Sequence, residues 1–139
     1  MAIIGGAGNP VGGSFTGPAE ALEIIGNHAY AFSSAGGQTV GEGEVTKLDF
    51  MSGISYYAVG TINAFTSDTS THSYVVRIYF NEAKIIDGLY NNINSNFSDD
   101  MNPIPILIPP ATQVKVTIQV LSASVDSASA QIVGRIYRD

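Results

Sequence analysis

Apolar and polar residues alternate over short stretches along most of this 139-residue chain. The clearest case is 103–122, where the pair Pro109-Pro110 separates two apolar runs. In the second run the even positions are all β-branched aliphatic residues: Val114, Val116, Ile118 and Val120. A period of two is typical of a half-buried β-strand. The sequence therefore predicts a strand, a corner at the two prolines, and a second, longer strand.

The same alternation predicts further strands along the chain, with turn signals between them. They fall at 24–33, 44–50, 55–65, 73–80, 84–90 and 128–138. With the two strands of 103–122 this makes about eight, and no stretch predicts a helix of ten residues. Short strands joined by polar turns are typical of an antiparallel sandwich or barrel, and eight strands in two sheets is the jelly-roll number. We expect an all-β, jelly-roll-like β-sandwich in a single domain.

Some positions leave local alternatives open. The segment 18–25 can form a short helical turn or already be strand, and 34–43 is expected to be a glycine-rich loop. Within 44–50 the alternation places Thr46, Leu48 and Phe50 on one face. Glycine inside a strand indicates a bulge or a close neighbour, so we expect one or the other at Gly60 and a bulge at Gly134.

Residues 1–18 differ in composition from the rest and form an N-terminal arm preceding the sandwich at 19–139. The arm is rich in Gly and Pro, which disfavours both helix and strand. Its glycines lack the preceding strand and following helix that a phosphate-binding loop requires. The arm is either a disordered tail or a segment that docks on a neighbour. Its apolar residues favour docking, with these expected contacts: Ile3, Ile4, Val11 and Phe15.

Composition narrows the class of partner. Charged residues are only 13% of the chain, against about 25% in a typical soluble domain, and the formal net charge is −6. Six basic residues against twelve acidic ones argue against a nucleic-acid partner, because neutralising phosphate requires Lys and Arg. The absence of Cys excludes disulfides and thiolate metal sites. The sequence lacks both a run of ~20 apolar residues and a basic signal-peptide start, so we expect no membrane partner and synthesis in a cytoplasm.

Candidate chemistry lies in two polar stretches, 66–73 and 91–102, which are expected to be loops. Their side chains with catalytic or ligand potential are Asp68, His72, Asn96, Asp99 and Asp100. A triad of Ser, His72 and Asp68 lacks the turn that presents a serine nucleophile, and adjacent carboxylates on extended chain diverge. The oxygen ligands suit Ca²⁺ chemically, but their spacing matches no calcium motif.

The other imidazole, His28, is interpreted as an ordinary strand residue. Two histidines are too few for the clustered ligands of a cupin-like metal enzyme. We therefore predict no catalytic residue, no metal ligand and no cofactor. The two polar loops remain candidate sites for binding glycan hydroxyls.

Three stretches carry a resemblance to a known class of protein: GGAGNPVGGSFTGPAEALEIIG, LIPPATQVKV and IVGRIYR. They resemble small structural proteins of tailed-phage or environmental virus particles. In such proteins a single jelly roll commonly lies outside the capsid as a decoration or cement protein, often as a trimer, and some hold neighbours with an N-terminal arm.

The resemblance implies a non-enzymatic virion structural protein, made in the host cytoplasm, that forms a homo-oligomer on the shell. A homotrimer and a major capsid protein of a bacteriophage are the expected partners. The alternative is the receptor- or glycan-binding head of a phage tail fibre, or a lectin-like binding module.

Overall fold

The structure is a computed structural model and describes residues 19–33, 36–67, 72–92, 99–100, 103–122 and 125–138. Within these ranges all regular secondary structure is β-strand. The strands are β1 (Ala19–Ala21), β2 (Glu23–Ile25), β3 (His28–Phe32), β4 (Gly36–Gln38), β5 (Val45–Met51), β6 (Tyr56–Ser67), β7 (His72–Phe80), β8 (Ala83–Asn92), β9 (Asp99–Asp100), β10 (Ile104–Ile108), β11 (Gln113–Val120) and β12 (Val125–Arg138).

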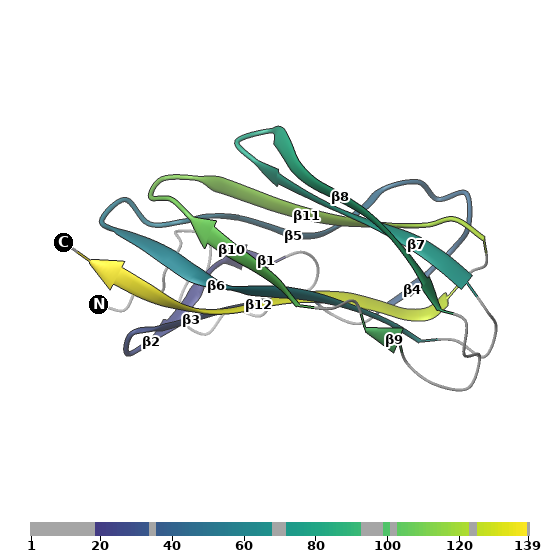
Figure 1. Cartoon of the computed structure of the whole chain (residues 1–139), viewed down its shortest axis with the longest axis horizontal. Helices are drawn as coiled ribbons and strands as arrows, with labels where there is room; N and C mark the ends of the chain where they lie inside the picture. Colours follow the sequence, from purple (N-terminus) through teal and green to yellow (C-terminus); the bar gives the residue numbers. More distant parts are fainter. Residues whose placement is uncertain are drawn as a thin grey trace.

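These strands form two sheets that lie face to face (Figure 1). The first, called the β11 sheet below, has the order β1-β5-β11-β7-β8. The second, the β12 sheet, has the order β10-β6-β12-β3-β2, with β4 beside β12 and β9 beside β6. The described strand pairs are antiparallel except β1 with β5, which is parallel.

Eight of these strands pair in a nested order. β7 pairs with β8, β6 with β10, β5 with β11, and β3 with β12. Successive pairs belong to opposite sheets, which is the result of rolling up one long antiparallel hairpin. This is the jelly-roll topology. The predicted all-β, jelly-roll-like sandwich is therefore confirmed.

The core lies between the two sheets and consists mainly of branched aliphatic side chains. Those at most 2% exposed include Leu48, Ile62, Ile78, Val116, Ile118 and Ile132, which come from both sheets. Fully burying such a side chain stabilises the fold by about 1.5–3 kcal/mol relative to leaving it exposed. Gln38 of β4 also links the two sheets, because its Nε2 donates to the Ile118 carbonyl at 2.6 Å.

The first described strands connect the two sheets. β1 belongs to the β11 sheet and β2 to the β12 sheet, so 19–25 is strand and not a helical turn. Leu22, between them, is completely buried. Its side chain fixes the point where the chain passes from one sheet to the other.

Two local predictions about the segment 34–50 are wrong. Thr46 does not share a face with Leu48, because a β-bulge intervenes. Leu48 pairs with Val116 but Thr46 pairs with Thr117, so the extra residue Lys47 turns Thr46 to the outer face. The stretch 34–43 is also not loop throughout, because β4 forms within it and pairs with β12.

Gly134 is also not at a bulge. The pairing of β6 with β12 continues in register from Ser67 to Tyr56, and Gly134 lies opposite Gly60. A Cβ placed on Gly60 would lie 2.3 Å from the Val133 carbonyl oxygen. The close-neighbour interpretation of Gly60 is therefore correct, and the same reason applies to Gly134.

Candidate interaction surface

The outer face of the β12 sheet is built from rows of side chains that cross the strands. One row runs over five strands and consists of Leu107, Val59, Arg135, His28 and Ile25. The next row consists of Pro105, Thr61, Val133, Tyr30 and Glu23. Flanking these rows are Tyr57 with Tyr137 at one side, and Asn63, Gln131 and Phe32 at the other.

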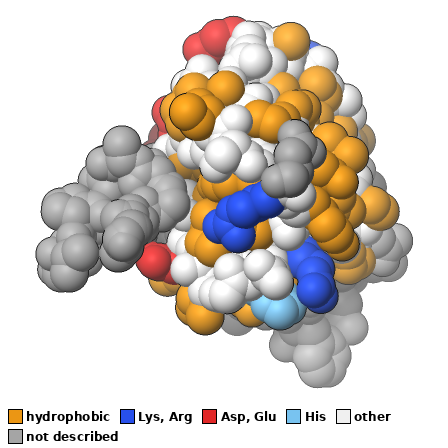
Figure 2. Space-filling view, turned by 90° about the vertical axis from the view of Figure 1, so that its left-hand side faces the viewer, with side chains coloured by type: hydrophobic (Ala, Val, Ile, Leu, Met, Phe, Trp, Pro, Cys, Tyr) orange, Lys and Arg blue, Asp and Glu red, His pale blue; other side chains and the backbone are white. Residues whose placement is uncertain are grey.

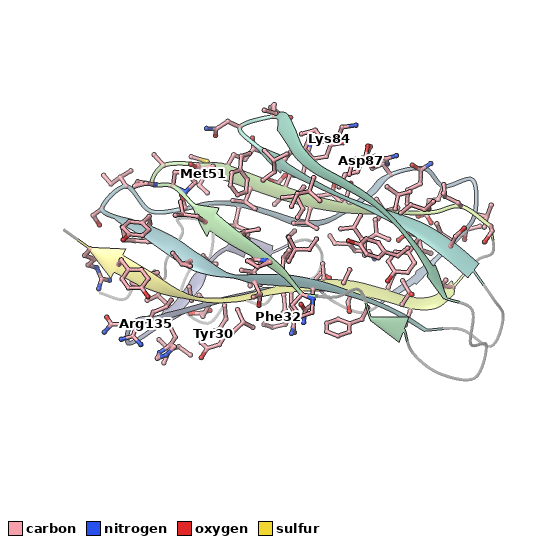
Figure 3. The ribbon with its side chains drawn as sticks, in the orientation of Figure 1. Tyr30, Phe32, Met51, Lys84, Asp87 and Arg135 are labelled. Carbon is pink, nitrogen blue, oxygen red and sulfur yellow. The ribbon has the colours of Figure 1, made fainter. Side chains whose placement is uncertain are left out.

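This face is largely apolar although it points away from the core. Seven large hydrophobic side chains on it are at least 36% exposed: Ile25, Phe32, Tyr57, Val59, Leu107, Val133 and Tyr137. Figure 3 shows Tyr30, Phe32 and Arg135 projecting from this sheet away from the other one. We call these rows the apolar face. Contiguous exposed apolar patches above a few hundred Å² mark interaction sites in soluble proteins.

The outer face of the β11 sheet is different, because ion pairs and hydrogen bonds link its charged side chains, although Met51 and Leu89 are also exposed there. Arg77 Nε lies 3.4 Å from Asp87 Oδ1, and Lys84 Nζ lies 2.9 Å from Asp87 Oδ2. Lys84 and Asp87 lie on this side of the sandwich in Figure 3. Lys115 Nζ lies 5.2 Å from the centre of the Tyr79 ring. Such a charged surface is suited to contact with water.

Glu44 is the centre of that polar network. Its Oε2 accepts hydrogen bonds from the Tyr79 hydroxyl at 2.5 Å and the Thr117 hydroxyl at 2.6 Å. Burial alone would raise the pKa of Glu44. The hydrogen bonds from Thr117 and Tyr79, with the charges of Arg77 and Lys115, outweigh that effect and lower the pKa below its ordinary value of 4.5. The ionised carboxylate is therefore the form that the fold favours.

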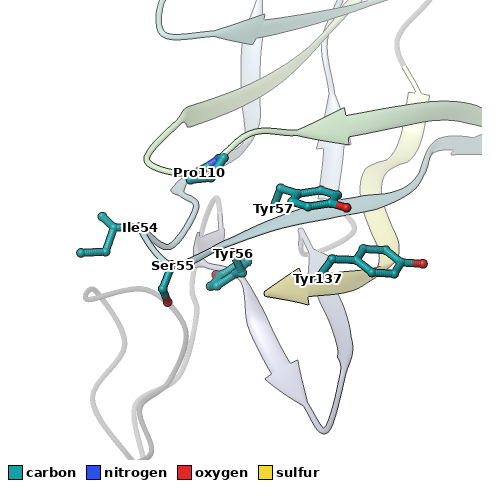
Figure 4. A pocket seen from close by; sticks show the side chains of 6 residues that line it. All are labelled: Ile54, Ser55, Tyr56, Tyr57, Pro110 and Tyr137. Atoms are coloured by element: carbon teal, nitrogen blue, oxygen red, sulfur yellow. The ribbon is translucent and has the colours of Figure 1, made fainter. Parts of the chain in front are cut away.

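At one end of the apolar face, Tyr57 and Tyr137 stack with ring centroids 5.4 Å apart. They border a shallow hollow of about 80 Å³, which is also lined by Ile54, Ser55, Tyr56 and Pro110 (Figure 4). Figure 2 looks onto the end of the sandwich where β12 ends, and hydrophobic side chains cover much of it around a few Lys and Arg side chains. The apolar character therefore continues from the sheet onto this end.

The structure describes three of the candidate residues from the sequence, His72, Asp99 and Asp100, and does not place all three in one sheet. Ile3, Ile4, Val11, Phe15, Asp68 and Asn96 lie outside the described residues. His72 is not in a loop, because it begins β7 and pairs with Asn92 in the β11 sheet. Asp99 and Asp100 are also not in a loop, because they form β9 and pair with β6 in the other sheet. His72 and these two aspartates thus belong to opposite sheets.

Among the residues that the structure describes, no group of three or more His, Asp or Glu side chains could hold a metal ion. The same part of the chain has no helix with the length and apolar character needed to span a bilayer. Its most distinctive chemical feature is the contrast between the apolar face and the ion-paired face opposite.

Sequence reasoning did not identify the apolar face, although a signal was present. Tyr57 and Val59 occupy odd positions of β6, and Val133 and Tyr137 occupy odd positions of β12. Even positions in the same strands are also apolar, including Ile62 and Ile132. A strand that is apolar on both sides is expected to be covered on both sides.

Comparison with solved structures relates this fold to chains from virus particles. A chain of the T13 particle of infectious bursal disease virus matches 92% of this chain with a TM-score of 0.51 and 17% identity. A chain of the Gx strain of that virus gives 0.48 and 15% over 92% of this chain, and the VP2 subviral particle gives 0.46 and 14% over 92%.

The matches cover 36%, 38% and 38% of those viral chains, so this chain spans little more than a third of their length. At these identities the likeness shows the fold alone. A comparison with protein-family models found no match. A comparison with curated proteins by sequence found none either. The class that fold and surface define is thus a jelly-roll β-sandwich, with a fold shared by a chain of an icosahedral virus particle.

Proposed function

We propose that this protein is a non-enzymatic structural component of a virion. The observation that supports this most is the nested jelly-roll pairing of the described strands, in a fold that matches a chain of the infectious bursal disease virus particle over 92% of this chain. The apolar face adds a second reason, since a protein that works alone in water has little use for such a surface. Its mechanism would be adhesion through buried apolar area.

In finer detail, we propose a capsid decoration or cement protein that oligomerises on a shell of major capsid protein. Residues 1–18 contain no charged residue, and the apolar side chains Ile3, Ile4, Val11 and Phe15 would bury area against a neighbour. The acidic balance, with a net charge of −6, suits an outer position better than contact with a packaged genome. The homotrimer that the resemblance implies stays a prediction.

The test is quantitative peptide mass spectrometry on purified particles of the virus that encodes this chain. A copy number comparable with that of the major capsid protein is the result expected for a decoration protein. A few copies per particle would instead indicate a vertex or tail component. Absence from the particles would contradict the virion function.

A receptor- or glycan-binding module is the second candidate, and the Tyr57–Tyr137 stack beside its hollow favours it. Exposed aromatic rings provide flat apolar surfaces with a polar hydroxyl at one end. A glycan array tests it with Tyr137→Ala, and with Leu89→Ala on the outer face of the β11 sheet as the control. Glycan binding that is lost in the first variant and kept in the second would support this function over the structural one.

A further inference from the structure

We infer that the apolar face is the contact between two copies of this protein, packed face to face about a two-fold axis. The inference gives a partner to the proposed virion function and rests on it for its biological role. The pairing itself is a property of the isolated protein, so it can be measured without particles. Three observations carry it: the composition of the face, its charge and its size.

The composition of the apolar face is that of an interface core. Aromatic residues and Arg are enriched in the buried centres of protein interfaces, whereas Lys, Asp and Glu are depleted. The four rows that make up the apolar face contain four aromatic side chains, one Arg, one Glu and neither Lys nor Asp. The aromatic and charged members of these rows are Tyr30, Phe32, Tyr57, Tyr137, Arg135 and Glu23. The ion-paired outer face of the β11 sheet lacks this pattern.

The distribution of charge favours a second copy as the partner. The four rows of the apolar face contain one acidic residue, Glu23, and one Arg, Arg135, so the formal charges of these rows cancel. The strands of the same sheet also include Asp99, Asp100 and Asp126, which lie beyond these rows. A chain with a net charge of −6 can therefore pair through these rows without bringing two like net charges together.

The size of the face meets the minimum for a specific pair. Five strands at ~4.8 Å spacing are about 24 Å wide, and four rows at ~6.8 Å are about 27 Å long. The outer rows cross only two and three strands, which reduces this to roughly 490 Å² per copy, or ~1,000 Å² in total, about the minimum for a specific interface. Sheets that pack face to face in this way lie ~10 Å apart with interdigitating side chains.

Arg135 gives the contact its specificity. It lies in the five-strand row between Val59 and His28, and it makes no ion pair with another described residue. A planar guanidinium can stack on an aromatic ring or form a bidentate pair with a carboxylate. In a two-fold pair, each copy presents tyrosine rings and the Glu23 carboxylate to Arg135 of the other copy. Leaving Arg135 buried without such a partner would be costly, so the register of the two faces is restricted.

The test is the mass of the purified full chain by sedimentation equilibrium, at concentrations up to about 100 μM, where even weak pairs are detectable. The expected mass is twice 14.6 kDa, whereas three times 14.6 kDa would support the homotrimer that the resemblance implies and overturn the two-fold pair. Val133→Asp places a charge at the centre of the apolar face and is expected to weaken the pair at least about tenfold. The matched control is Leu89→Asp, which adds the same charge at a side chain 60% exposed on the outer face of the β11 sheet and should leave the pair intact.

A second variant keeps the inference testable if Val133→Asp fails to fold. The chain has no Cys, so Val133→Cys introduces a single thiol near the expected axis. Under mild oxidation it should form an intermolecular disulfide much faster than Leu89→Cys does. Wild-type protein that stays monomeric, or an oligomer that neither substitution at Val133 affects, would overturn the inference.

The pairing and the proposed function can fail separately. A chain found in purified particles, but monomeric in solution and insensitive to Val133→Asp, would leave the virion function standing and remove the face-to-face contact. A pair that depends on Val133, from a chain absent from particles, would do the reverse. A trimer disrupted by both Val133→Asp and Leu89→Asp would also overturn the two-fold contact, because each copy would then use two different surfaces.

Discussion

Gly60 and Gly134 face each other across β6 and β12 on the core side of the sheet. A Cβ on Gly60 would lie 2.3 Å from the Val133 carbonyl oxygen and 2.6 Å from Gly134 Cα, both backbone atoms. Backbone atoms in the middle of a paired ladder cannot move aside as a flexible side chain can. The two glycines therefore allow the two central strands of the β12 sheet to approach closely.

Gly60→Ala is expected to lower the free energy of unfolding by about 2 kcal/mol or more, because the added methyl group overpacks this contact. Urea denaturation followed by circular dichroism measures the change. Gly36→Ala in β4 is the matched control, since a Cβ there meets nothing within 4 Å. Equal stability of the two variants would contradict the close-approach argument.

Glu44 makes stability depend on pH. Its pKa is lowered in the folded protein, so its contribution is fully present above its ordinary value of 4.5 and is lost as the pH falls through the lower, folded value. Glu44→Gln should therefore be less stable than wild type at neutral pH, and the difference should shrink on acidification. Unfolding free energies at a series of pH values test this. A difference that stays constant with pH would show that the carboxylate charge is not the cause.

At the scale of elements, the proline corner between β10 and β11 is joined to the connection between β5 and β6. Ser52 Oγ donates to the Pro109 carbonyl at 2.7 Å and accepts from the Thr112 backbone N–H at 2.9 Å. The Ser52 N–H also donates to the Thr112 carbonyl at 2.8 Å. One hydroxyl thus holds together two connections that both cross between the sheets.

Ser52→Ala should cost about 1–3 kcal/mol, because it removes the partner of a buried N–H and of a carbonyl. Ser52 is only 4% exposed, so water cannot easily take its place. The control is Ser55→Ala, an exposed position on the same connection, which should change stability by less than about 0.5 kcal/mol. Thermal unfolding of both variants would reveal whether the hydroxyl, or merely the segment, matters.

At the scale of the whole molecule, the two outer faces have opposite character. The face of the β11 sheet carries ion pairs around Arg77 and Asp87, and the apolar face of the β12 sheet exposes side chains such as Phe32 and Val133. A jelly roll with this asymmetry has a side suited to water and a side suited to protein. An orientation relative to a partner is therefore built into the folded domain.

Deleting residues 2–17 should leave the sandwich folded, because the core described above is formed by residues from Leu22 onward. We expect a change in unfolding free energy of less than about 1 kcal/mol, together with loss of particle association. Circular dichroism and co-sedimentation with particles measure the two effects. An unfolded deletion product would refute this division of roles between arm and sandwich.

Much of the fold could be predicted because the strand pattern is local. The alternation at 113–120 correctly placed Val114, Val116, Ile118 and Val120 on one face, and that face is buried in the core. It failed at Lys47, where an extra residue shifts the register by one and moves Thr46 to the outer face. A bulge depends on the partner strand, so the sequence of β5 alone does not contain it.

By itself, the sequence determined the longer strands, the proline corner and the all-β class, because a period of two and turn residues such as Pro109-Pro110 act over a few neighbours. Only the tertiary structure decided which apolar side of β6 and β12 lies inside. Ile62 and Ile132 became core because they face the β11 sheet, whereas Val59 and Val133 face outward. This arrangement depends on the pairing of β6 with β12, which joins residues about 70 positions apart in the sequence. No local pattern encodes that pairing.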